Sequence, residues 1–147
     1  MVRINTFTDE YFFLSNFYEV PVTYKGLTYP STEAAFHAQK TGNFFQRLKC
    51  TRLDPLQSKR YGRTFRLRKN WDEIKCGIMH DIVKAKFTQN PDLGQKLIDT
   101  GDAYLVEGNT WKDTYWGVYN GHGENNLGRI LMQVRQELKE EGYDTVG

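Results

Sequence analysis

The stretch VTYKGLTYPSTEAAFHAQKTG, residues 22–42, joins a predicted β-hairpin directly to a predicted helix. Two alternating β-prone runs flank Lys25-Gly26, a pair typical of a tight hairpin turn. A helix is expected from about Thr32 to Thr41, and Gly42 ends it because glycine readily takes the backbone conformation that follows a helix. This segment therefore places a strand pair and a helix side by side at the start of the fold.

Outward from this segment the pattern is mainly helical. The clearest helix covers Trp71 to Phe87, where apolar residues recur at helical spacing. Further helices are expected at 55–61, at 91–98 and from 127 to a stop at 142, strands at 103–107 and 115–119, and an apolar strand or turn at 11–17. Elements of both kinds in non-alternating order predict an α+β fold. A length of 147 residues predicts one compact domain over residues 1–147.

The net charge of the chain and the distribution of its basic residues indicate which partners are expected. A net charge of +2 argues against a dedicated nucleic-acid binder that depends on counterion release. Basic residues nevertheless cluster within eleven positions, where they could meet a local anion such as a phosphate. The cluster comprises Lys59, Arg60, Arg63, Arg66, Arg68 and Lys69.

Several chemistries lack their signatures in this sequence. The two cysteines have no metal-ligand spacing, the three histidines are scattered, and no serine has a nucleophile-elbow context. We therefore expect no metal and no cofactor. The N-terminus has no apolar signal-peptide core, and no run approaches the roughly 20 apolar residues that span a bilayer. A soluble, cytoplasmic protein without a membrane partner is expected.

The helix after the hairpin carries a candidate reaction centre. Offsets of four and seven residues return to nearly the same helix face, so Glu33, His37 and Lys40 project together. A carboxylate, an imidazole and an amine on one face can perform acid–base chemistry. The alternative is a solvated face, because Glu33 suits a helix N-terminus and forms an ordinary i,i+4 pair with His37.

Two lysines interrupt the apolar face of the helix at 71–87. Lys75 and Lys86 fall inside the arc that its apolar residues define, and lysines are rarely buried without a partner. Either they extend along the apolar surface to reach solvent, or they line a polar pocket that faces a carboxylate or an anionic ligand. The sequence leaves both alternatives open.

A polar segment between the last predicted strand and the last helix also carries candidates. Asp113 stands before an aromatic pair and a glycine, where it could orient a sugar hydroxyl or act as an acid or base. It could equally bond only its own backbone in a turn. The loop at 121–128 could bind an anion at the start of the last helix, or could simply cap that helix through Asn125 or Asn126.

With these segments in order, the chain resembles the NADAR family, the YbiA-like N-glycosidases. Matching pieces keep their order over nearly the whole chain, and nine in register are specific although no single one is diagnostic. They include FLSNF (13–17), YPSTE (29–33), AQK (38–40), RKNW (68–71), KFTQN (86–90), LVE (105–107), DTYWG (113–117), NNLG (125–128) and LMQVR (131–135). The chain departs from relatives at Ala34, where they often carry His, and at His37, where Gln is common. The second departure removes His37 from the expected catalytic set.

The resemblance implies a compact, mainly helical α+β domain with a few short strands. It also implies hydrolysis of an N-glycosidic bond that joins ribose to a base or amine. Two substrate types are associated with relatives: ribosylamino-pyrimidine phosphates of early riboflavin synthesis, and ADP-ribose attached to guanine. The expected partners are therefore a small ribosylated base or nucleotide, or ADP-ribosylated nucleic acid. Family positions match Glu33, Trp71 and Asp113.

These matches give each candidate a role. Glu33 would stabilise an oxocarbenium-like state and activate water, with Asp113 orienting ribose hydroxyls or sharing proton transfers. Trp71 offers a stacking face for the base, and Lys40 is a candidate for covalent attack on an opened sugar. The remaining candidates for substrate contacts are Asn16, Arg68, Lys75, Lys86, Trp116 and Asn125. The competing hypothesis is a non-catalytic module that binds ADP-ribose or a related nucleotide.

Overall fold

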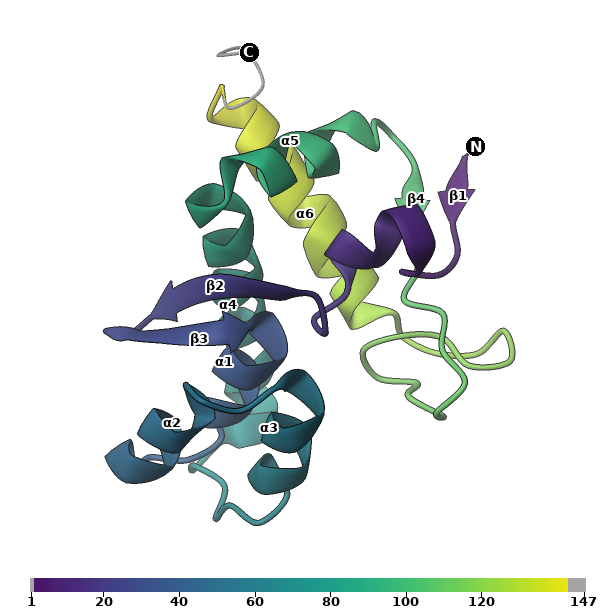
Figure 1. The fold of residues 1–147 in the computed structure, drawn as a ribbon. Helices are drawn as coiled ribbons and strands as arrows, with labels where there is room; N and C mark the ends of the chain where they lie inside the picture. Colours follow the sequence, from purple (N-terminus) through teal and green to yellow (C-terminus); the bar gives the residue numbers. More distant parts are fainter. Residues whose placement is uncertain (1, 143–147) are drawn as a thin grey trace. The chain divides into compact units, whose positions relative to one another are not determined.

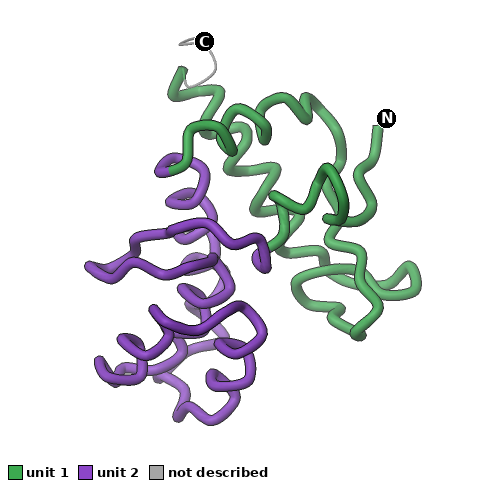
Figure 2. Tube along the Cα trace, in the orientation of Figure 1, with its two compact units in different colours: residues 1–15, 90–147 green, residues 16–89 purple. Residues whose placement is uncertain are grey.

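The computed structural model describes residues 2–142, which belong to two compact units. Figure 2 shows these as the hairpin unit, residues 16–89, and the terminal unit, residues 1–15 and 90–147. Helices make up most of the regular structure and the strands are short, so the predicted α+β class is confirmed (Figure 1). The prediction of a single domain over the whole chain stays a prediction.

The hairpin unit begins with the predicted strand pair. Strands β2 (Glu19–Tyr24) and β3 (Leu27–Ser31) pair antiparallel, with Tyr24 opposite Leu27. Lys25 and Gly26 both have positive φ, 51° and 84°, which is the conformation of the tight turn that matches the twist of a hairpin. The predicted hairpin is confirmed, turn included.

Helix α1 (Thr32–Ala38) follows β3 without a linker. Its N-cap Ser31 accepts a hydrogen bond from the Ala34 amide, which satisfies one of the free donors at the helix start. All seven residues of α1 are buried, so the helix is the centre of this unit rather than part of its surface. It ends at Ala38, earlier than the predicted Thr41.

Three more helices surround α1 in the hairpin unit. They are α2 (Phe44–Cys50), which the sequence did not predict, α3 (Pro55–Gly62) and α4 (Trp71–Gln89). Helix α1 contacts all three, and α4 also packs against β2. A capping box between Asp54 and Gln57 starts α3. The predicted helices at 55–61 and 71–87 are thus confirmed, each slightly longer than expected.

The terminal unit pairs β1 (Arg3–Ile4) in parallel with β4 (Tyr104–Leu105) and contains helices α5 (Pro91–Asp99) and α6 (Asn126–Glu140). A 3-10 helix, η1 (Asp9–Leu14), lies where the sequence suggested a strand or turn. The strand expected at 115–119 forms only isolated bridges, Gly108 with Val118 and Tyr119 with His122. Among the described residues, no helix is long and apolar enough to cross a membrane.

Candidate active site

The side chains of Glu33 and His37 form a buried pair on α1. His37 Nε2 lies 2.7 Å from Glu33 Oε2, and the two side chains are 8% and 12% exposed. The seven-residue helix places them one turn apart, so the predicted i,i+4 pair is confirmed. The alternative of a solvated face is wrong for both residues, because little of either side chain reaches water.

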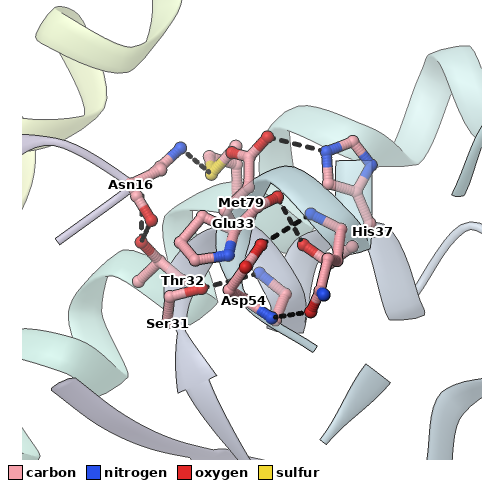
Figure 3. A network of polar contacts seen from close by, with 11 residues as sticks. Asn16, Ser31, Thr32, Glu33, His37, Asp54 and Met79 are labelled. Carbon is pink, nitrogen blue, oxygen red and sulfur yellow. Dashed lines mark hydrogen bonds and ion pairs between the residues drawn. The ribbon is translucent and has the colours of Figure 1, made fainter. Parts of the chain in front are cut away.

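Hydrogen bonds of Asn16 connect the segment before β2 to the start of α1 (Figure 3). Its backbone carbonyl accepts the Glu33 amide at 3.1 Å, and its side-chain oxygen accepts the Thr32 hydroxyl at 2.9 Å. The side-chain nitrogen points to the Met79 sulfur of α4 at 3.6 Å. Asn16, predicted to contact substrate, is thus placed beside Glu33, where its bonds fix the helix that carries the carboxylate.

The second ring nitrogen of His37, Nδ1, has different surroundings from Nε2, which faces Glu33. Among the described residues it is the one buried side-chain polar atom without a hydrogen bond. Gly62, the last residue of α3, covers it so closely that a Cβ there would lie 3.0 Å from Nδ1. His37 was not expected in the catalytic set, although its i,i+4 spacing from Glu33 is a sequence signal that places it beside the carboxylate.

Lys40 follows α1 and lies partly buried, with its ammonium 6.0 Å from the centre of the Phe36 ring. Burial lowers the pKa of Lys40, and the nearby charge of Glu33 acts in the opposite direction. The positive charges of Arg63, Lys59 and Lys75 lower this pKa further. A larger fraction of this amine is therefore unprotonated at neutral pH than for an ordinary lysine.

Arg68 and Trp71 approach α1 from the segment that leads into α4. The Arg68 guanidinium donates to the Gln39 carbonyl at 3.2 Å, and its amide donates to the Lys40 carbonyl at 2.9 Å. Trp71 is 7% exposed, and its ring lies 5.3 Å from that of Phe36 at a tilt of 48°. Both predicted residues thus lie beside α1, where Trp71 offers a ligand only a small part of its surface.

The two lysines of α4 have different environments. Lys75 is partly buried and its ammonium lies 3.0 Å from Asp72 Oδ1, one turn earlier on the same helix. Lys86 is 1% exposed, and its ammonium lies 5.6 Å and 5.1 Å from the Tyr18 and Phe87 ring centres. Burial lowers the pKa of Lys86 to about 7. Lys86 therefore does not extend to solvent, which was one of the two alternatives.

The candidates of the terminal unit lie in a loop whose polar side chains mostly bond backbone. Asp113 Oδ1 accepts the amides of Tyr115 and Trp116 at 3.0 Å and 2.9 Å. The half-buried Trp116 ring meets the Tyr115 ring edge-on, with centres 4.8 Å apart. This is the turn geometry that was the alternative to a catalytic Asp113. It occupies one carboxylate oxygen and leaves the role of the other as a prediction.

The side chain of Asn125 connects the end of the loop to β4 and to the residues that follow β4. It has a left-handed backbone with φ of 56°, and its side chain makes no cap hydrogen bond to α6. Instead its oxygen accepts the Glu107 amide and its nitrogen donates to the Leu105 carbonyl, each at 2.9 Å. Gly128 completes this contact, because a Cβ there would lie 2.2 Å from the Leu105 carbonyl oxygen. Asn125 is thus the N-cap residue of α6, one of the two positions expected for it, but its side chain bonds the backbone at Leu105 and Glu107 and not the helix.

The hairpin unit thus collects most of the predicted site around α1, and adds His37. It holds Asn16, Glu33, Lys40, Arg68, Trp71, Lys75 and Lys86. The loop of the terminal unit holds Asp113, Trp116 and Asn125. Within residues 2–142, no group of three or more His, Cys, Asp or Glu side chains is placed to hold a metal ion.

The buried helix α1 carries a carboxylate paired with an imidazole, and the half-buried amine of Lys40 follows it. Groups of these kinds can perform acid–base hydrolysis. Residues 4–139 match the family model of the NADAR domain, and the chain belongs to that family. N-glycosidase YbiA of Escherichia coli strain K12 is 37% identical over 142 residues, which cover 94% of this chain and 88% of YbiA. The chain is accordingly a hydrolase of the N-glycosidase class.

Two further similarities extend this result. The NMR structure of the E. coli protein YbiA superposes with a TM-score of 0.87 at 37% identity, covering 96% of this chain and 87% of that one. Riboflavin biosynthesis protein VVA0006 of Vibrio vulnificus is 42% identical over 132 residues, which cover 87% of this chain. The match spans only 36% of the Vibrio protein, so the chain corresponds to one part of it.

Proposed function

We propose that this enzyme hydrolyses the N-glycosidic bond between ribose and a base or amine, with Glu33 as the catalytic carboxylate. The observation that carries the proposal is the state of that side chain. Oε2 is held by His37 at 2.7 Å, while Oε1 accepts no hydrogen bond from any described residue. A carboxylate with one oxygen fixed and the other open is suited to activating a water molecule or stabilising positive charge.

Glu33 would act where the bond breaks. Departure of the base leaves positive charge at the ribose C1 and ring oxygen, and a nearby carboxylate stabilises that charge. Glu33 would then take a proton from the water that attacks C1 and pass it to the leaving nitrogen, so that the ribose gains the hydroxyl and the base gains the hydrogen. The burial of the pair strengthens this effect, because electrostatic interactions weaken less in a site with little water.

Lys40 supports a second, covalent route. Its lowered pKa leaves more free amine, which can attack C1 of a ring-opened ribosylamine. The new bond between Nζ and C1 would replace the bond from C1 to the base nitrogen, and the base would leave protonated. Water would then hydrolyse the resulting imine and return the lysine. This route needs an opened sugar, whereas direct hydrolysis does not.

Positive charges near Lys40 favour a phosphorylated substrate. Lys59 of α3, Arg63 at its C-cap and Lys75 of α4 all act on the Lys40 amine electrostatically, so several positive charges lie within reach of Lys40. Phosphate oxygens are well matched to such a group. This supports a ribosylamino-pyrimidine phosphate, the substrate type that also fits the name of the Vibrio relative.

ADP-ribosylated guanine in nucleic acid is the second candidate substrate, and the charge distribution favours it. Residues 43–69 contain a single acidic residue, Asp54, which is engaged as the N-cap of α3. The same segment carries nine basic residues: Arg47, Lys49, Arg52, Lys59, Arg60, Arg63, Arg66, Arg68 and Lys69. Phe44 and Phe45 of α2 are 57% and 77% exposed. Cations with exposed aromatic rings are the usual features of a single-strand binding surface.

A side-by-side mass-spectrometric assay tests the function and ranks the substrates. Purified protein meets a ribosylamino-pyrimidine phosphate and an ADP-ribosylated guanine oligonucleotide, with Glu33→Gln as the control. Faster base release by the wild type than by Glu33→Gln supports the glycosidase and identifies its substrate. Ligand binding with wild-type turnover no faster than that of the variant would support the non-catalytic binding module instead. Borohydride trapping of an adduct that is lost in Lys40→Ala would establish the covalent route.

A further inference from the structure

The hydrogen bond between His37 and Glu33 has a defined direction because of what surrounds the imidazole. A neutral imidazole carries one N–H, on either Nδ1 or Nε2, and the neighbours of each nitrogen decide which. Nε2 faces the Glu33 carboxylate at 2.7 Å, and Nδ1 is buried without a hydrogen-bond partner in the part of the chain that the structure describes. The two positions of the proton therefore differ in free energy.

A proton on Nδ1 is unfavourable on both sides of the ring. It would bury an N–H with no acceptor, and it would turn the Nε2 lone pair toward an oxygen that also carries lone pairs. A proton on Nε2 instead donates to Glu33 and leaves only a bare acceptor at Nδ1. Protonating both nitrogens would again bury an unpaired N–H at Nδ1. Of the two neutral tautomers, the favoured one therefore carries its proton on Nε2 and donates it to Oε2 of Glu33.

Gly62 maintains this state from the opposite side. A Cβ at that position would lie 3.0 Å from Nδ1 and 3.1 Å from the His37 Cβ, so the glycine allows the α3 backbone to lie directly on the ring. The ring also meets Phe36 edge-on, with centres 5.7 Å apart. These contacts hold the imidazole in one orientation, and no group of residues 2–142 accepts a hydrogen bond from Nδ1.

We propose that His37 is a positioning residue for Glu33: its Nε2–H fixes Oε2 of an ionised carboxylate and so presents Oε1 to the reacting ribose or its water. This inference rests on the proposed glycosidase function of Glu33. A glutamine can also donate an N–H to Oε2, so the same task is open to either residue.

The test compares His37→Phe, which keeps a ring but removes the donor, with His37→Gln, which restores an N–H donor. We expect His37→Phe to lower kcat about ten- to hundredfold, the range for losing one hydrogen bond to a charged group, with KM nearly unchanged. His37→Gln should recover most of that loss. His80→Phe is the matched control, because His80 also lies 3.1 Å from a carboxylate, that of Asp81, but outside this site; its kcat should equal that of the wild type.

Nitrogen NMR of the three histidines gives a readout independent of turnover. The His37 signal, assigned from its absence in His37→Gln, should show a neutral ring protonated on Nε2. A ring protonated on Nδ1 would overturn the positioning role, as would equal kcat values for the wild type and a folded His37→Phe. If the wild type releases no base from either substrate while NMR shows the Nε2 proton, the glycosidase proposal fails. The positioning role then fails too, because Glu33 would have no reaction to serve.

Discussion

The α1 helix and the loop at residues 109–125 both carry polar side chains that are shielded from water, but these side chains bond different groups. In the loop, Asp113 and Asn125 bond mainly backbone groups, so their polar atoms hold the chain in shape. On α1, Glu33 bonds another side chain, that of His37, and keeps one oxygen open. The difference separates polar groups that maintain a fold from the carboxylate to which we assign the proposed chemistry.

The largest expected effect comes from Glu33→Gln. The amide is nearly the same size as the carboxylate and can still accept the His37 N–H, so the free energy of unfolding should change by less than about 1 kcal/mol. Loss of a general base typically lowers turnover about 10²- to 10⁴-fold, and kcat should fall within that range. Steady-state kinetics with denaturant unfolding measures both quantities. Turnover above a tenth of the wild-type value would remove Glu33 from the chemistry.

A pH-dependent stability is expected from Lys86, a deeply buried lysine of the hairpin unit. Its folded pKa of about 7 lies below its ordinary value of 10.5, so between these pH values the unfolded chain binds more protons than the folded one. Stability therefore rises with pH in this window, by up to about 1.4 kcal/mol per pH unit. Urea unfolding of the wild type and Lys86→Met should diverge with this slope.

Lys69→Met is the control for this measurement, because Lys69 is exposed and the substitution also removes one positive charge. Its stability should follow the wild type from pH 7 to pH 10. If the wild type and Lys86→Met keep a constant difference over that range, Lys86 remains charged in the folded protein and the inferred window is wrong.

A smaller effect is expected in the loop, where two substitutions of Asp113 separate shape from chemistry. Asp113→Ala removes the acceptor of two backbone N–H groups and should lower the free energy of unfolding by about 1–3 kcal/mol. Asp113→Asn keeps an acceptor oxygen and should stay within about 1 kcal/mol of the wild type. Thermal and urea unfolding test this contrast.

The same pair decides the proposed catalytic role of Asp113. A carboxylate that orients ribose or shares a proton cannot be replaced by an amide, so Asp113→Asn should then be stable and at least about tenfold slower. Wild-type turnover in Asp113→Asn would leave Asp113 with only its turn contacts. Equal stability of Asp113→Ala and the wild type would instead contradict the structural role.

Local signals in the sequence predicted much of the hairpin unit, and tertiary contacts account for what they missed. The hairpin and α4 were predictable because their signals are local in the sequence: the Lys25-Gly26 turn and a long run of apolar residues at helical spacing. Helix α2 was missed because Phe44, Phe45 and Leu48 are exposed, so its apolar residues do not mark a core-facing side. The short apolar run that became η1 is ambiguous between strand and helix for any periodicity argument.

The site divides in the same way. The spacing of Glu33 and His37 predicted their contact, because it depends only on helix geometry. The unpartnered Nδ1 depends on Gly62 of α3, which lies 25 residues further along the chain and packs on α1 only in the folded protein. The turn role of Asp113 was one of two alternatives, and no local pattern distinguishes an aspartate that bonds backbone from one that waits for a ligand.

The smallest expected effect comes from Gly62→Ala in the hairpin unit, which tests whether α3 holds the His37 ring in place. Gly62→Ala adds a Cβ 3.0–3.3 Å from three His37 atoms and should displace the ring by a few tenths of an ångström. The better helix propensity of alanine, about 1 kcal/mol, offsets much of the crowding, so stability should change little while kcat falls a few-fold. Gly77→Ala on α4 is the matched control, since nothing lies within 4 Å of its added Cβ. That variant should gain about 0.5–1 kcal/mol with unchanged kcat. Equal kcat values for the two variants would show that contact with α3 does not set the position of His37.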